Sequence, residues 1–152
     1  MAAKSWLSLL VFLALVGAAA GTGMRFLPGP WYETLVKPAW TPPNWLFPPV
    51  WTVLYLMIAV AGWRVYEHLG PGPALGVWLV ALLLNAAWSP IMFGAHRIGL
   101  AAIDIAALWV AVVAFIALTW RPEPVAALLF VPYLVWISYA AALNLAIYRL
   151  NP

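Results

Sequence analysis

Five long apolar segments constrain the fold of this chain more than any other feature. A transmembrane helix needs about 20 mostly apolar residues, and each segment is long enough to be one. They cover residues 5–27, 45–68, 74–94, 98–119 and 124–149. Only 7% of the 152 residues are charged, whereas a soluble domain carries about 25%. The sequence therefore predicts an all-α membrane protein whose main partner is membrane lipid.

The connections between these segments contain helix breakers or charges, as helix ends require. Three of them are only a few residues long: Gly70-Pro71-Gly72-Pro73, Ala95-His96-Arg97 and Arg121-Pro122-Glu123-Pro124. Consecutive helices should therefore be antiparallel neighbours. The remaining connection, residues 28–44, is long. We expect a single domain over residues 1–152, a bundle of five transmembrane helices in which the long first loop acts as a lid.

The charged residues do not orient this bundle. Three Lys or Arg residues fall on one side of the five spans and four on the other, which is no bias under the positive-inside rule. The net charge of +3 includes no basic run, so we expect no nucleic-acid partner. The start of segment 5–27 imitates a secretory signal peptide, but about 23 apolar residues are long for one, and we expect an uncleaved span.

The 11 tryptophans and 14 prolines exceed what spanning a bilayer requires. Residues 31–51 read WYETLVKPAWTPPNWLFPPVW, and these prolines force extended or turn backbone. Tryptophan gathers at membrane interfaces, and we assign to that belt the four that lie near helix ends: Trp6, Trp63, Trp78 and Trp120. Four others lie further inside their spans, where a belt does not explain them: Trp51, Trp88, Trp109 and Trp136.

Helical spacing places several of these inner tryptophans on faces that mix aromatic, small and polar residues. The three faces are Trp51, Tyr55, Ile58 and Gly62; Trp78, Ala81, Asn85, Trp88, Ser89 and Met92; and Trp136, Tyr139, Ala140, Leu143 and Ile147. Such faces suit a flat apolar ligand held by stacking. They equally suit close helix packing, and spacing alone leaves both interpretations open.

Asp104 is the one acidic residue well inside a predicted span, and a carboxyl group there is costly enough to suggest function. We favour a structural role, a hydrogen bond to an indole N–H or to Asn85, over proton transfer. Pro90 and Pro132 should kink their helices. His68 and His96 are too isolated for a metal site, so none is expected.

Small residues on the first segment allow another helix to approach closely. They are Ala14, Gly17 and Gly21. The partner is either another helix of the bundle or a second copy of the chain. We favour a homodimer with these three residues in its interface.

Several motifs together resemble the tryptophan-rich sensory protein family, also called the translocator protein or peripheral benzodiazepine receptor family. They are Trp31-Tyr32, Lys37-Pro38-Ala39-Trp40-Thr41-Pro42-Pro43, Trp51, Leu84-Asn85-Ala86-Ala87-Trp88-Ser89, Asp104, Val131-Pro132-Tyr133-Leu134-Val135-Trp136 and Leu143-Asn144. The resemblance covers essentially the whole chain, which looks like a bacterial member. It implies an integral multi-pass protein of a bacterial cell membrane, with the outer membrane as the alternative.

The resemblance also implies a dimeric bundle whose first loop closes a pocket for porphyrins such as protoporphyrin IX and haem, for sterols, and for benzodiazepine-type drugs. No obligatory cofactor is implied. Carried over residue by residue, the ligand-binding set is Tyr32, Trp40, Pro42, Trp51, Tyr55, Asn85, Trp88, Ser89, Asp104, Trp136, Ala140 and Leu143. A sterol-facing surface would use Leu143, Tyr148 and Arg149, although the spacer that the family's sterol motif places between the last two is missing.

Two functions follow from this resemblance. In the first, a receptor or transport-type protein binds a tetrapyrrole, with its carboxylates near Arg25, Lys37 or the backbone of the lid loop and its ring between Trp51 and Trp136. In the alternative, an enzyme degrades porphyrin in light and oxygen, and Trp51 and Trp136 are the catalytic residues. A coupled transporter fits less well, because lone Asp104 supplies only half of an ionisable pair.

Overall fold

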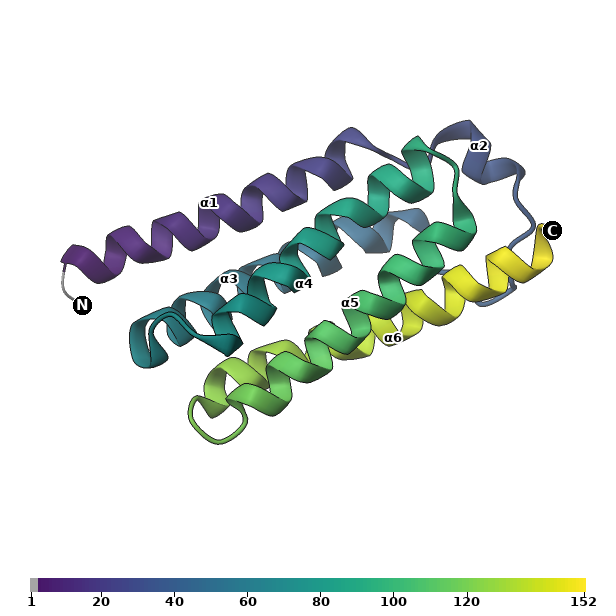
Figure 1. The fold of residues 1–152 in the computed structure, drawn as a ribbon. Coiled ribbons are helices and arrows are strands. Elements are labelled where there is room, and N and C mark those ends of the chain that lie inside the picture. Colours follow the sequence, from purple (N-terminus) through teal and green to yellow (C-terminus); the bar gives the residue numbers. More distant parts are fainter. Residues whose placement is uncertain (1–2) are drawn as a thin grey trace.

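Five long helices run side by side in the computed structural model, which describes residues 3–152. They are α1 (Ala3–Arg25), α3 (Phe47–Leu69), α4 (Pro73–Ser89), α5 (Ile98–Thr119) and α6 (Pro124–Leu150). With their adjoining turns, all five are long and apolar enough to cross a membrane. The two ends of the chain lie at opposite ends of the bundle (Figure 1), as an odd number of spans requires. The predicted all-α membrane fold with five spans is confirmed.

Proline and glycine set the helix ends. Three of the long helices, α3, α4 and α6, carry proline in their first turn, where the missing N–H costs least. Gly70 ends α3 with a φ of +70°, a backbone angle that glycine adopts without strain. Its N–H donates to the carbonyl of Tyr66 at 3.1 Å. The short connections are therefore encoded locally.

Three short elements complete the fold. The first connection begins with α2 (Gly29–Thr34) and ends with a 3₁₀ turn, η1 (Asn44–Leu46). A π-helical turn, η2 (Pro90–Gly94), follows α4 directly. Its closing hydrogen bond runs from the N–H of Ala95 to the carbonyl of Pro90 at 2.8 Å. The predicted distortion at Pro90 thus takes the form of one wide turn, whereas α6 continues through Pro132 as a single helix.

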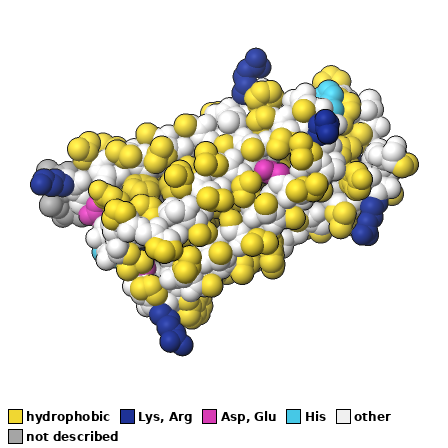
Figure 2. Space-filling view, in the orientation of Figure 1, with side chains coloured by type: hydrophobic (Ala, Val, Ile, Leu, Met, Phe, Trp, Pro, Cys, Tyr) yellow, Lys and Arg dark blue, Asp and Glu magenta, His cyan; other side chains and the backbone are white. Residues whose placement is uncertain are grey.

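The core lies where α5 packs between α4 and α6, with α1 against α3 and α4. Phe115 and Phe130 are fully buried, and their ring centroids are only 4.0 Å apart. The outer surface is apolar over most of the visible face, and Lys and Arg side chains project from its edges (Figure 2). Burial and exposure in this molecule therefore do not separate apolar from polar residues, because lipid replaces water around the bundle.

The assignment of Trp78 to the interfacial belt is wrong. Its side chain is 1% exposed, and its indole N–H donates to the carbonyl of Ile58 at 2.9 Å. A Cβ atom on Gly62 would lie 2.4 Å from its ring, so glycine at this position is what allows α3 and α4 to meet there. Trp6 and Trp120 are exposed, as a belt requires.

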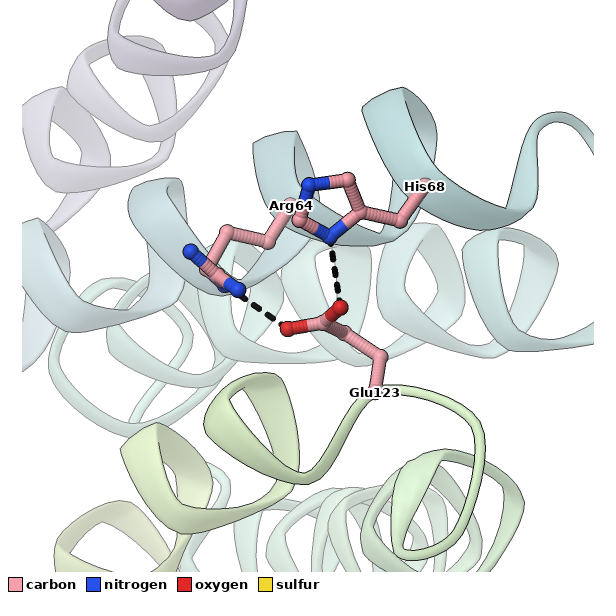
Figure 3. A network of polar contacts seen from close by, with 3 residues as sticks. All are labelled: Arg64, His68 and Glu123. Atoms are coloured by element: carbon pink, nitrogen blue, oxygen red, sulfur yellow. Dashed lines mark hydrogen bonds and ion pairs between the residues drawn. The ribbon is translucent and has the colours of Figure 1, made fainter.

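The end of the bundle that holds the α3–α4 and α5–α6 turns, called the closed end below, is tied by a charged cluster. Glu123, in the turn before α6, accepts hydrogen bonds from Nε of Arg64 at 2.7 Å and from Nδ1 of His68 at 2.6 Å. Both partners reach it from α3 (Figure 3). Burial alone raises the pKa of the Glu123 carboxyl, but the bonds from His68 and Arg64 and the nearby positive charge outweigh this and hold it below its ordinary value.

The small-residue face of α1 has no partner helix within the described chain. A Cβ atom added to Gly17 or Gly21 would meet nothing within 4 Å, and Ala14 is exposed. The prediction that this face receives a second copy of the chain stays a prediction.

Candidate ligand-binding site

A cavity of about 360 Å³ lies at the opposite end of the bundle, called the loop end below, where α2 and the first connection cover the helices. Its size falls in the range of about 300–1000 Å³ that small-molecule pockets occupy. All five long helices contribute to its wall, as do α2 and η2. Most of the lining is apolar, including Phe47, Met92, Phe93, Ile105 and Leu108.

The structure brings eight of the twelve predicted pocket residues to this cavity. They are Tyr32, Trp51, Tyr55, Asn85, Trp88, Ser89, Ala140 and Leu143. The other four do not line it: Trp40, Pro42, Asp104 and Trp136. The cavity wall therefore draws on all three of the helix faces that spacing singled out.

Aromatic rings form much of the wall. The ring centroids of Trp51 and Tyr55 are 5.2 Å apart on α3. Across the cavity, Trp88 meets Phe93 edge to face at 5.3 Å. Sequence reasoning missed Phe93, although it follows Ser89 by four residues and so lies on a face that had already been singled out. The wide turn of η2 places Met92 and Phe93 together on the wall.

Trp136 supports the wall from behind. Its ring meets that of Trp51 edge to face, with centroids 6.5 Å apart and an interplanar angle of 88°, and it also packs against Phe47. No planar ligand fits between two rings in this arrangement. The expectation that a porphyrin ring lies between Trp51 and Trp136 is therefore corrected, because only Trp51 lines the cavity.

Amide side chains link the helices around the cavity. Asn85 accepts a hydrogen bond from the Tyr55 hydroxyl at 3.0 Å and donates one to the Tyr133 hydroxyl at 2.8 Å. Asn144 accepts from the Trp88 indole at 3.0 Å and donates to the carbonyl of Ile98 at 3.1 Å. Both amides reach the cavity surface, so they join helices and offer polar groups to a ligand at once.

Asp104 does not make the hydrogen bond expected of it. Its side chain is buried, and its Oδ2 has no hydrogen-bond partner within the described chain. Asn85 donates to the Tyr133 hydroxyl instead, and the buried Nε1 of Trp136 also has no partner within the described chain. The predicted hydrogen bond from an indole N–H or Asn85 to Asp104 is therefore wrong.

Aromatic contacts attach α2 to the bundle. Tyr32 is buried, lines the cavity and meets Phe93 edge to face at 5.4 Å. Burial raises the pKa of the Tyr32 phenol. Beside it, Trp31 stacks flat on His96, with centroids 4.1 Å apart and planes within 8°. The long first connection thus contributes Tyr32 to the cavity, together with Pro28 and Asn44, and packs Trp31 against the α4–α5 turn.

Lys37 serves the loop. Its ammonium group donates to the carbonyls of Tyr32 at 2.7 Å and Leu35 at 3.0 Å, and it lies 4.7 Å from the Tyr32 ring centroid. These contacts satisfy carbonyls at the end of α2, as basic side chains commonly do at helix C-termini. The expectation that porphyrin carboxylates lie near Lys37 stays a prediction, and a ligand there would compete with these carbonyls for the ammonium group.

Trp40 and Pro42 belong to the outer part of the same connection. The Trp40 carbonyl accepts a hydrogen bond from the Tyr139 hydroxyl, and their rings meet edge to face at 5.6 Å. The Trp40 side chain is exposed and points away from the cavity lining. These residues position the loop without reaching the cavity.

The three residues of the predicted sterol surface do not share one face. Leu143 is buried and lines the cavity. Tyr148 and Arg149 are exposed, and the Tyr148 ring covers Gly99, where an added Cβ would lie 2.9 Å from it. A sterol on the outer surface would therefore meet Tyr148 and Arg149 without Leu143.

A shallower groove of about 230 Å³ adjoins the cavity on the outer face of α1 and α3. The two share Ala20, Thr52 and Tyr55. The cavity therefore lies close to the lipid-facing surface. Among the described residues no three His, Asp or Glu side chains could hold a metal ion together, and neither His68 nor His96 lines the cavity.

A family model described as TspO/MBR matches residues 6–149. The chain belongs to the TspO/MBR family. This match confirms the resemblance that the loop and helix motifs suggested.

Relatives of this TspO/MBR protein cover nearly its whole length. Protein CrtK of Rhodobacter capsulatus is 39% identical over 146 residues, which span 93% of this chain and 91% of that protein. Tryptophan-rich protein TspO of Chlorobaculum tepidum is 40% identical over 159 residues, spanning 98% and 99%. Translocator protein of Homo sapiens is 34% identical over 157 residues, spanning 98% and 93%. Family membership and five apolar helices together make this TspO/MBR protein an integral membrane protein.

Proposed function

We propose that this TspO/MBR protein binds a tetrapyrrole, such as protoporphyrin IX or haem, in the cavity at the loop end, as a receptor or carrier in a bacterial membrane. The observation that carries the proposal is the cavity wall, where Trp51, Tyr55 and Trp88 combine with two side-chain amides. Such a wall suits a flat, largely apolar ring held by stacking and oriented by few hydrogen bonds.

The surroundings of the cavity favour a ligand that arrives from lipid. The lining is mostly apolar, and the adjoining groove opens on the outer face of α1 and α3. Arg25 lies between Met24 and Phe26, both of which line the cavity. With Lys37 engaged by carbonyls, Arg25 is the cation that we expect near the ligand's carboxylates. A haem held here would lack a histidine ligand from the described chain, so the porphyrin ring itself would supply the affinity.

Titration of the detergent-purified protein with protoporphyrin IX tests this proposal, with the porphyrin absorption band and tryptophan fluorescence as readouts. We expect saturable binding that Trp51→Phe weakens about fivefold, in line with the ~0.5–1.5 kcal/mol of an aromatic contact. Trp6→Phe is the matched control, because Trp6 is exposed near the start of α1, far from the cavity. Binding that does not saturate, or equal effects of the two variants, would overturn the proposal.

Illumination of the same complex separates binding from the alternative, light-driven porphyrin degradation. The edge-to-face contact of Trp51 with Trp136 makes this alternative worth testing, because an indole on the cavity wall touches a second one behind it. Degradation by the protein predicts that the porphyrin band fades in the wild type and persists in the Trp51→Phe, Trp136→Phe double variant. Equal fading in both proteins would mean uncatalysed bleaching and leave binding as the function.

A further inference from the structure

The last turn of α6 holds the first connection through one side chain, Asn151. Its Oδ1 accepts a hydrogen bond from the N–H of Val36 at 2.9 Å, and its Nδ2 donates to the carbonyl of Val36 at 2.9 Å. Nδ2 also donates to the carbonyl of Ile147 at 2.8 Å. One primary amide therefore makes with Val36 both of the main-chain bonds that a neighbouring β-strand would make.

The two hydrogen bonds between the Asn151 amide and Val36, called the clamp below, hold the backbone alone. The Val36 side chain is 57% exposed, so its packing contributes little to holding the segment. Leu35 ends α2 in an extended conformation, and α2 carries Tyr32, which closes part of the cavity. Ile147, which anchors the amide on α6, also lines the cavity. The clamp thus joins the segment that covers the cavity, residues 29–45 and called the covering segment below, to a helix of the cavity wall.

Besides this clamp, aromatic packing holds α2, where Tyr32 is buried and meets Phe93 edge to face at 5.4 Å. Trp31 stacks on His96 at the start of α2, and the Tyr139 hydroxyl binds the carbonyl of Trp40 further along. Between and beyond these points the side chains of Val36, Trp40 and Trp45 are exposed. From Glu33 to Leu46 no residue is buried, and stretches with few buried apolar contacts open locally at low free energy, so the clamp at Val36 has a large share in keeping this part closed.

We propose that Asn151 is the latch of the first connection, a positioning residue that keeps α2 over the cavity and sets how often the cavity opens. The amide touches no cavity surface, so it acts through the loop. The claim that this latch also limits ligand exchange rests on the proposed function. The claim that it holds the loop is independent of that function.

Amide hydrogen exchange tests the latch without any ligand. In Asn151→Ala we expect the amides of residues 29–37 to exchange about tenfold faster as a group, because two lost hydrogen bonds correspond to roughly that factor or more. Asn151→Asp would turn a second oxygen toward the carbonyls of Val36 and Ile147, which are also acceptors, so it should accelerate exchange at least as much as Asn151→Ala. Arg149→Gln, an exposed position two residues earlier, is the control.

The pattern of exchange decides between a latch and a merely local bond. Faster exchange at Val36 alone would overturn the proposal, because the rest of α2 would then be held independently. Equal acceleration in Arg149→Gln would overturn it as well, since general loosening of the α6 end would explain both. Acceleration across α2 in both Asn151 variants, absent from Arg149→Gln, supports it.

Stopped-flow mixing with protoporphyrin IX tests the link to the cavity. A latch that makes no contact with the ligand should, when removed, raise the association and dissociation rate constants together by about tenfold and change their ratio by less than about threefold. A damaged site would instead lower the amount of porphyrin bound. Unchanged rate constants alongside faster exchange of α2 would overturn control of the cavity by the latch. Failure of the wild type to bind porphyrin would overturn the proposed function and leave the exchange experiment to decide the latch.

Discussion

The closed end and the loop end of the bundle are built from the same five apolar helices, yet they hold together differently. At the closed end, Trp78 fills the space over Gly62, and a buried carboxylate ties α3 to the turn before α6. At the loop end, the helices leave a cavity of about 360 Å³, and a few hydrogen bonds and ring contacts hold its cover. The difference follows from the length of the connections and the size of the facing side chains, because the same five helices reach both ends.

This comparison places most of the global stability at the closed end and most of the mobility at the loop end. Close packing of large and small side chains transmits any change in volume, whereas a cover held by isolated tethers opens without disturbing the core. Each of the following substitutions tests that division.

Gly62→Ala should have the largest effect on stability. The new Cβ would lie 2.4–2.8 Å from three atoms of the Trp78 ring, which a hydrogen bond to Ile58 and an edge-to-face contact with Phe12 at 5.0 Å hold in place. We expect a loss of about 2–3 kcal/mol in the free energy of unfolding, measured by denaturant titration in detergent.

Gly76→Ala is the control for that variant. A Cβ atom at Gly76, also in a helix that borders the core, would meet nothing within 4 Å. We expect it to change stability by less than about 1 kcal/mol. Similar losses in both variants would mean that glycine is needed for the helices in general and not for the contact with Trp78.

Glu123→Gln should have the next largest effect, about 1–2 kcal/mol, because it replaces a buried acceptor of two hydrogen bonds whose partners are partly exposed. The folded-state pKa of this carboxyl lies below its ordinary value of 4.5. Its contribution is therefore present above pH 4.5 and is lost as the pH falls through the lowered value. The free energy of unfolding, measured from pH 6 down to pH 3, should therefore fall more steeply in the wild type than in Glu123→Gln.

Glu67→Gln provides the comparison for this charge. Glu67 is exposed and, among residues 3–152, its one side-chain partner is the Ser8 hydroxyl, at 2.6 Å, so we expect a change below about 0.5 kcal/mol and no altered pH dependence. Parallel pH profiles for the wild type and Glu123→Gln would contradict the assignment of acid sensitivity to the cluster at the closed end.

Tyr139→Phe should have the smallest effect on global stability, below about 0.5 kcal/mol, although it removes the hydrogen bond to the Trp40 carbonyl at the loop end. The loss falls on a segment that already opens locally. Amide exchange of residues 38–41 should accelerate while the denaturation midpoint stays in place. A denaturation midpoint lowered as much as in Glu123→Gln would show that the two ends unfold together and do not differ in stability.

Much of the bundle follows from local sequence. Apolar length, prolines in first turns and Gly70 predict the spans and the short connections, because these signals act within one helix or turn. Helical spacing also predicts most of the cavity wall, since Trp51, Tyr55, Asn85 and Trp88 lie on the faces that it singled out.

The errors have a common physical origin. Trp6 and Trp78 are both near helix ends, yet one is exposed and the other is buried, because only the neighbouring helix decides which way a ring points. Asp104 was expected to bind an indole N–H or Asn85, but Asn85 bonds to the hydroxyls of Tyr55 and Tyr133 instead. Competition for hydrogen-bond partners is a property of the folded structure.

The sequence by itself therefore determined the class of protein, the number of spans and the faces rich in aromatic residues, since each depends on the period and length of an apolar pattern. Tertiary structure alone decided which aromatic rings surround empty space and which fill it. It also decided that Asn151 holds Val36 across 115 positions of the chain. Contacts between distant residues depend on how five similar helices pack together, and no local pattern encodes that arrangement.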